Sequence, residues 1–275
     1  MVLLSATFDP HGPRGRATVW APSVVAASVA ITLVCLGLAM AMLDGRLRGF
    51  GRAMATAAVH GGLLAIGWIL ATGERPLSLG PALRLAAVVL VAASASRVTA
   101  WGALFYLLPP GLLLREARRH PILRRAGLGV SASGKSTVLG LAAGVFLGVH
   151  LLIAASLTLG YNVRVEHLEH YLAAVAYDIG ANALTAEWLF RGALFSRCWQ
   201  RREFWPAAGL STAFAVGRYL VDPALPGTLE VRAGAVFYMS LLGLSACALR
   251  AASGSLVPGY LASVVFFAAY RLLMP

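Results

Sequence analysis

The stretch Ala186-Glu187-Trp188-Leu189-Phe190-Arg191-Gly192 decides how this chain is interpreted, because it places two charges inside the long apolar segment Tyr171–Trp199. Glu187 and Arg191 are four residues apart, so on a helix they share one face and can form an ion pair. A charged pair inside an apolar helix is costly and is therefore a candidate functional site. The alternative is that the pair is only a neutralised structural contact between helices.

The composition indicates a membrane protein. The 275 residues are 59% hydrophobic and 12% charged, with a mean hydropathy of +0.76, which excludes a soluble globular domain. We predict an all-α polytopic integral membrane protein with about seven or eight transmembrane helices. The run Pro81–Leu114 forms either one long helix or two short ones broken near Ser94–Arg97. The apolar runs long enough to span are Ser23–Leu43, Ala53–Thr72, Pro81–Leu114, Ser136–Gly160, Tyr171–Trp199, Phe204–Leu220, Ala233–Leu249 and Ser255–Leu273.

The net charge of +12 is explained by the membrane rather than by nucleic acid, since arginines mark cytoplasmic loops and meet anionic lipid. We therefore expect the lipid bilayer, and no nucleic acid, as a partner. Arg115–Arg125, Arg197–Arg202 and Arg250 are predicted to be cytoplasmic. The loops Tyr161–His170 and Asp222–Arg232 are predicted to lie outside.

Three regions are expected along the chain. Residues 1–22 form a flexible arm, residues 23–135 form N-terminal transmembrane helices with a basic cytoplasmic loop, and residues 136–275 form a membrane core. Cys35, Cys198 and Cys247 show no CxxC spacing and are predicted to be packing residues.

Two short motifs suggest ligands that their context does not support. The segment Gly129–Ser136 matches the phosphate-binding pattern GxxxxGK[ST], but a basic loop precedes it and an apolar helix follows it, so we expect a helix cap and no nucleotide. The cluster Glu166, His167, Glu169 and His170 lacks a distant further ligand, so no metal or other cofactor is expected. His60 is predicted to form hydrogen bonds between helices.

From Ser136 to Leu273 the chain resembles the CPBP family of intramembrane peptidases, which includes CAAX prenyl proteases and bacteriocin-processing (ABI) proteins. That family carries Glu-Glu-x-x-x-Arg, Phe-x-x-x-His and His-x-x-x-Asn on core helices. The matching stretches here are Ala186-Glu187 to Arg191, Phe214 to Arg218, and Ala262 to Phe266, with the flanks Arg201-Arg202-Glu203-Phe204-Trp205-Pro206-Ala207 and Gly254-Ser255-Leu256-Val257-Pro258. One branch of the family is the myxosortase-like peptidases, but no residue of this chain identifies it as a member of that branch.

The departures fall on the residues that the resemblance implies to be catalytic. In the family, the first glutamate and the motif histidines activate a water molecule, whereas the positions here hold Ala186, Arg218 and Ala262. Only Glu187 and Arg191 are retained. An arginine inside the bilayer needs an anion, so we predict that Arg218 pairs with Glu187 in an ionic lock, with Asp178 and Asn182 as second choices.

Three functions are compatible with these residues. The first is a pseudoenzyme that binds a hydrophobic or lipidated protein tail or partners an active membrane peptidase. The second is an active endopeptidase that processes membrane-anchored precursors, with Glu187 as base and His150, His167 or His170 as its polarising partner. The third, a transporter, ranks last because no repeated halves are visible. Whether the chain is an enzyme is left open by the sequence.

Overall fold

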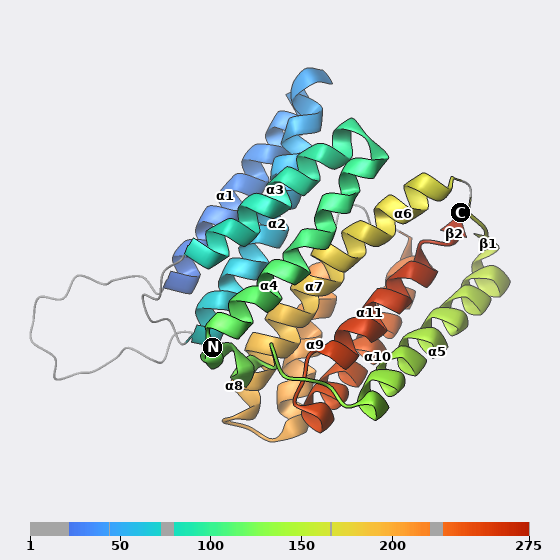
Figure 1. The fold of residues 1–275 in the computed structure, drawn as a ribbon. Helices are drawn as coiled ribbons and strands as arrows, with labels where there is room; N and C mark the ends of the chain where they lie inside the picture. The colour runs from blue at the N-terminus through green and yellow to red at the C-terminus, as the bar shows by residue number, and fades with distance from the viewer. Residues whose placement is uncertain (1–21, 44, 73–79, 166, 221–227, 275) are drawn as a thin grey trace, which may run out of the picture.

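The computed structural model describes residues 22–43, 45–72, 80–165, 167–220 and 228–274. The chain forms a bundle of packed helices, shown in Figure 1. This architecture confirms the predicted all-α polytopic membrane fold. Most of the predicted N-terminal arm, Glu166 and residues 221–227 of the Asp222–Arg232 loop lie outside the described residues.

Five described helices are long and apolar enough to cross a membrane. They are α1 (Pro22–Leu43), α2 (Gly45–Thr72), α3 (Gly80–Val98), α5 (Gly134–Leu159) and α10 (Leu229–Ser253). The shorter helices are α4 (Leu108–Arg119), α9 (Phe204–Leu220) and α11 (Val257–Tyr270), with 3-10 turns at η1 (Ala100–Leu107) and η2 (Pro121–Ala126).

The run Pro81–Leu114 is broken into two parts, which is the second of the two alternatives that the sequence left open. The break falls at Thr99, whose backbone is extended, just beyond the predicted Ser94–Arg97. The chain then turns back on itself, so that Arg84 near the start of α3 donates to Glu116 near the end of α4 at 2.9 Å. The region is therefore an antiparallel hairpin.

The motif segment is one continuous helical rod through the middle of the molecule (Figure 1). It comprises α6 (Leu168–Tyr177), η3 (Asp178–Ala183), α7 (Leu184–Ala186), η4 (Glu187–Phe195) and α8 (Ser196–Trp199). Both η3 and η4 are π-helical. Wide π turns inside helices are often found at functional sites. The rod separates two hydrophobic cores, one built mainly on α2 to α4 and one on α5 and α9 to α11.

Glycines let α5 and α11 approach closely. A Cβ at Gly144 would lie 2.6 Å from the carbonyl oxygen of Ala262, and one at Gly148 would lie 2.8 Å from the Cβ of Ala269. Gly140 makes the same kind of contact with the backbone of Pro258. Small residues at four-residue spacing are typical of membrane helix interfaces, where backbone contact replaces the hydrophobic effect as the attraction.

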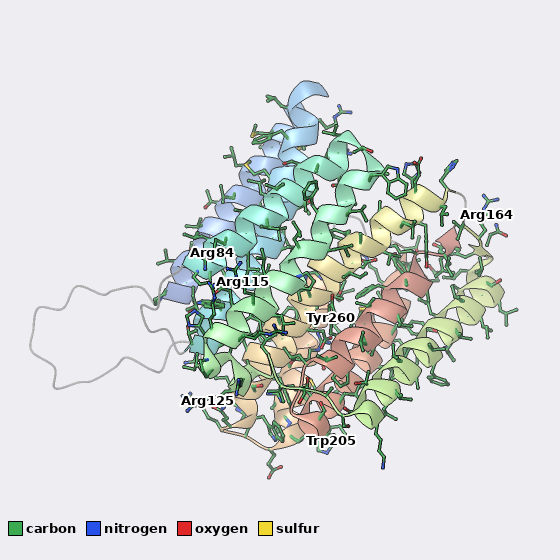
Figure 2. The ribbon with its side chains drawn as sticks, viewed as in Figure 1. Arg84, Arg115, Arg125, Arg164, Trp205 and Tyr260 are labelled. Atoms are coloured by element: carbon green, nitrogen blue, oxygen red, sulfur yellow. The ribbon has the colours of Figure 1, made fainter. Side chains whose placement is uncertain are left out.

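The two ends of the bundle differ in their residues. Arg125 and Trp205 lie at the end opposite to Arg164 in Figure 2. At the Arg125 end, Arg250 of α10 donates to the Arg125 carbonyl at 2.9 Å. At the other end, β1 (Asn162–Val163) pairs antiparallel with β2 (Leu273–Met274), which joins the 161–170 loop to the end of the chain.

Candidate functional site

Glu187 is the carboxylate of the first motif, and it is 2% exposed. Its Oε1 accepts a hydrogen bond from Ser263 Oγ of α11 at 2.8 Å and lies 3.8 Å from Arg191 Nε. Its Oε2 and Arg191 Nε have no hydrogen-bond partner among the described residues. The predicted Glu187–Arg191 pair is therefore present as a buried ion pair without a direct hydrogen bond.

Arg191 is held in place by the π-helical backbone around it. Its Nη1 donates to the carbonyl of Ala186, five residues earlier, at 3.4 Å. Gly243 of α10 leaves the room it needs, since a Cβ there would lie 2.8 Å from Arg191 Nη2. The guanidinium is only 3% exposed, so Glu187 is the acidic group that balances its charge at close range.

The structure changes which residues of α11 face Glu187. Ala262, placed there by the sequence comparison, has its backbone against Gly144 of α5, and Phe266 packs on Tyr238 with ring centroids 6.1 Å apart. Gly259 and Ser263 face the carboxylate instead: a Cβ at Gly259 would lie 2.9 Å from Glu187 Oε2. These two residues are four apart and share one face of α11.

Arg218 does not form the predicted ionic lock with Glu187. Its Nη1 donates to Asn182 Oδ1 at 2.9 Å, and Tyr219 donates to the same oxygen at 3.0 Å. The prediction is wrong in its first choice of partner, while Asn182 was a second choice. The reason is the register of α9, which runs antiparallel to the rod: Ser211 donates to the Phe190 carbonyl at 2.7 Å, so that Arg218, seven residues later, lies level with Asn182.

A second polar network continues from Asn182 toward the end of the bundle. Asn182 Nδ2 donates to Asp178 Oδ1 at 3.0 Å, and Arg271 holds Asp178 through Nε at 2.7 Å and Nη2 at 2.9 Å. Burial acts to lower the pKa of Arg271, but the hydrogen bonds and the charge of Asp178 outweigh it, so that pKa lies above its ordinary value. Arg271 therefore stays charged at any working pH.

A small cavity of about 10 Å³ lies beside the motif residues. Ala186, Arg191, Tyr219 and Ser263 line it together with Ala215, Met239, Leu242 and Phe267. Of the three positions where the family's catalytic residues are replaced, Ala186 lines this cavity directly. At the other two, the next residue in the chain lines it: Tyr219 after Arg218, and Ser263 after Ala262. A space of this size holds roughly one water molecule, and a polypeptide does not fit in it.

Each histidine that the structure describes has a polar or aromatic neighbour other than Glu187. His60 Nδ1 lies 3.1 Å from Thr185 Oγ1 and its Nε2 lies 2.7 Å from Tyr177 Oη, which confirms the predicted bonding between helices. His150 Nδ1 lies 2.7 Å from the hydroxyl of Tyr238. His167 and His170 face each other at the β1 end, with ring centroids 5.5 Å apart.

The sequence also singles out the GxxxxGK[ST] motif, the three cysteines and a group of possible metal ligands. Ser133 caps α5 by accepting from the Ser136 amide at 3.2 Å, so the GxxxxGK[ST] match is a helix cap as predicted, and the element before it is the 3-10 turn η2. The three cysteines are free. No group of three or more His, Cys, Asp or Glu side chains in the described part of the chain is placed to hold a metal ion.

The fold and this site define a multi-pass helical membrane protein whose first motif lies on the buried rod and whose other two motifs lie on α9 and α11. Residues 168–269 match the family model described as type II CAAX prenyl endopeptidase Rce1-like. The match confirms the resemblance to the CPBP, or CAAX protease, family over α6 to α11. Neither the comparison with curated proteins nor the one with solved structures found a match.

Proposed function

We propose that this protein is a non-catalytic member of the CAAX-protease-like group in a bacterial cytoplasmic membrane. It binds a hydrophobic or lipidated protein tail, or it acts as the partner of an active membrane peptidase. The Rce1-like match supports the class of ligand. The geometry of the motif residues supports the lack of peptidase activity.

One observation carries the proposal: the environment of the Glu187 carboxylate. General base catalysis requires a carboxylate free to accept a proton and a second group that polarises the reacting carbonyl. Here Oε1 of that carboxylate accepts from Ser263 and lies 3.8 Å from Arg191 Nε, so the carboxylate serves as the counter-ion of a buried guanidinium. The described histidines have their own partners elsewhere, and Ala186 offers no titratable group.

The geometry of α11 supports the same conclusion. Gly259 touches the Glu187 carboxylate, so any side chain at this position would displace that carboxylate. The Glu187 carboxylate therefore lies directly against the face of α11 that carries Gly259 and Ser263.

The alternative is an active endopeptidase that cleaves membrane-anchored precursors with Glu187 in a rearranged site. One observation favours it: Glu187 Oε2 has no hydrogen-bond partner among the described residues, and the neighbouring cavity has room for about one water molecule. Arg191 and Ser263 would then orient the carboxylate that activates this water.

The deciding experiment is co-purification from native membranes in mild detergent, followed by mass spectrometry. The wild type is compared with the double variant Glu187→Gln/Arg191→Gln, which removes the carboxylate without leaving a buried charge unpaired. The control is Glu230→Gln/Arg232→Gln, which neutralises the same two charges at the exposed start of α10.

A non-catalytic protein captures the same intact precursor or intact peptidase in all three forms. If wild type and control yield cleaved tails while the core double variant yields only the uncleaved precursor, the protein is an active endopeptidase and the proposal is rejected.

A further inference from the structure

A second site lies at the β1 end of the bundle, away from the motif core. A cavity of about 290 Å³ opens there between Arg164 and Val165 after β1, the start of α6 and the end of α11. Its lining includes Arg164, His167, His170, Tyr171 and Arg271. A cavity of this volume accommodates a small polar group such as a lipid headgroup.

The lining is basic. Arg164 supplies a positive charge, Arg271 adds a guanidinium whose charge Asp178 balances, the two histidines add donors, and no acidic side chain is among the described lining residues. Arg271 gives Nε and Nη2 to Asp178, which leaves Nη1 as its further donor. Asp178 is 1% exposed, behind Arg271.

The backbone amides at the start of α6 also favour an anion. α6 begins at Leu168, and its capping residue His167 makes no side-chain cap hydrogen bond. The first amides of a helix point outward and carry a partial positive charge, which favours an anion at this position. Arginine side chains and helix amides together match the oxygens of a phosphate group.

The position of the cavity indicates where the anion comes from. The spanning helix α5 ends at Leu159, and Arg164 follows within five residues, at the level where a membrane helix meets water. Tyr171 lines the same cavity and donates to the Ala268 carbonyl at 3.3 Å, and tyrosine is a residue type enriched at membrane–water interfaces. Arginine side chains near the ends of membrane helices extend to this level, where phospholipid headgroups lie.

We infer that this cavity binds the phosphate of an anionic phospholipid headgroup. Arg164, His170 and the free edge of Arg271 hold the phosphate oxygens, and the first amides of α6 complete the shell. The bound lipid ties the segment after β1 to the start of α6 and the end of α11. This site is independent of whether the motif core cleaves peptides.

The test uses the full-length protein, delipidated in detergent. Soluble short-chain phosphatidylglycerol is titrated while the thermal unfolding midpoint is followed, and native mass spectrometry counts the lipids retained. Two further arms replace this lipid by short-chain phosphatidylcholine or by inorganic phosphate at equal concentration. The variant is Arg164→Gln/His170→Gln, and the matched control is Arg232→Gln, an exposed arginine at the start of α10.

We expect phosphatidylglycerol to raise the midpoint, with one lipid retained by the wild type and by the control. Loss of a charge-assisted hydrogen bond weakens the apparent affinity of the double variant about tenfold or more. An equal shift of the unfolding midpoint with inorganic phosphate would show that the site binds a free anion, and it would overturn the assignment of a lipid headgroup. Wild-type affinity in the double variant, or no shift at all, would overturn the site itself.

Discussion

At the scale of single residues, Glu187 and Arg191 are each dependent on the other. Glu187→Gln keeps an acceptor for Ser263 but leaves the buried Arg191 without its counter-charge. We expect a loss of about 3 kcal/mol in unfolding free energy, the usual cost of breaking a buried pair. Thermal unfolding in detergent measures it.

The double variant Glu187→Gln/Arg191→Gln is the control for this prediction, since replacing both partners costs much less than replacing one. A single variant as stable as wild type would show that the pair is solvated or that the charges do not interact.

Gly259 is a second residue whose identity depends on Glu187. Gly259→Ala places a Cβ 2.9 Å from Glu187 Oε2 and 3.2 Å from Ala246 Cβ, so the carboxylate must move away from Ser263. We expect destabilisation by about 1–3 kcal/mol, as for overpacked cores. The matched control is Gly234→Ala on α10, where a Cβ meets nothing within 4 Å. That control should gain stability through helix propensity, and equal effects at both sites would contradict the contact.

At the scale of elements, α11 is attached to α5 through glycines. Gly144→Ala puts a Cβ 2.6 Å from the Ala262 carbonyl oxygen and 2.9 Å from its Cα, where only backbone can yield. We expect α11 to shift and stability to fall by about 3 kcal/mol, measured by denaturant or thermal unfolding. Gly217→Ala, in the open on α9, is the control and should be neutral or slightly stabilising.

The end of α11 is held by a different contact, the Asp178–Arg271 pair. Asp178→Asn leaves one acceptor oxygen for two arginine donors and removes the charge. We expect a loss of about 1–3 kcal/mol. Hydrogen exchange should accelerate in residues 268–273 and in β1, because β1 pairs with β2. Faster exchange in α2 instead would show that the effect is global unfolding.

At the scale of the whole molecule, the two ends of the bundle should face opposite sides of the membrane. Arg125→Cys and Arg164→Cys lie at opposite ends (Figure 2). In a background without other cysteines, an impermeant maleimide added outside intact cells should label Arg164→Cys only. Labelling of both from one side would contradict the arrangement, and labelling of Arg125→Cys alone would invert the predicted orientation.

Several features of the site could be predicted because they depend on local chemistry. The Glu187–Arg191 pair follows from four-residue spacing, and the polar partners of His60 follow from the cost of burying an imidazole alone in apolar surroundings. The capping role of Ser133 follows from its position before an apolar helix. The glycine spacing 140, 144 and 148, which joins α5 to α11, was available in the sequence as a small-residue pattern and was missed.

The sequence by itself determined the membrane class, the motif rod and its family resemblance, because hydropathy and short-range spacing are properties of consecutive residues. Only the tertiary structure decided that Arg218 pairs with Asn182, that Gly259 and Ser263 face Glu187 in place of Ala262, and that η3 and η4 are π-helical. The physical reason is that the rotation of one helix against another depends on packing. Turning a helix about its axis by one residue position changes which side chain reaches a buried charge.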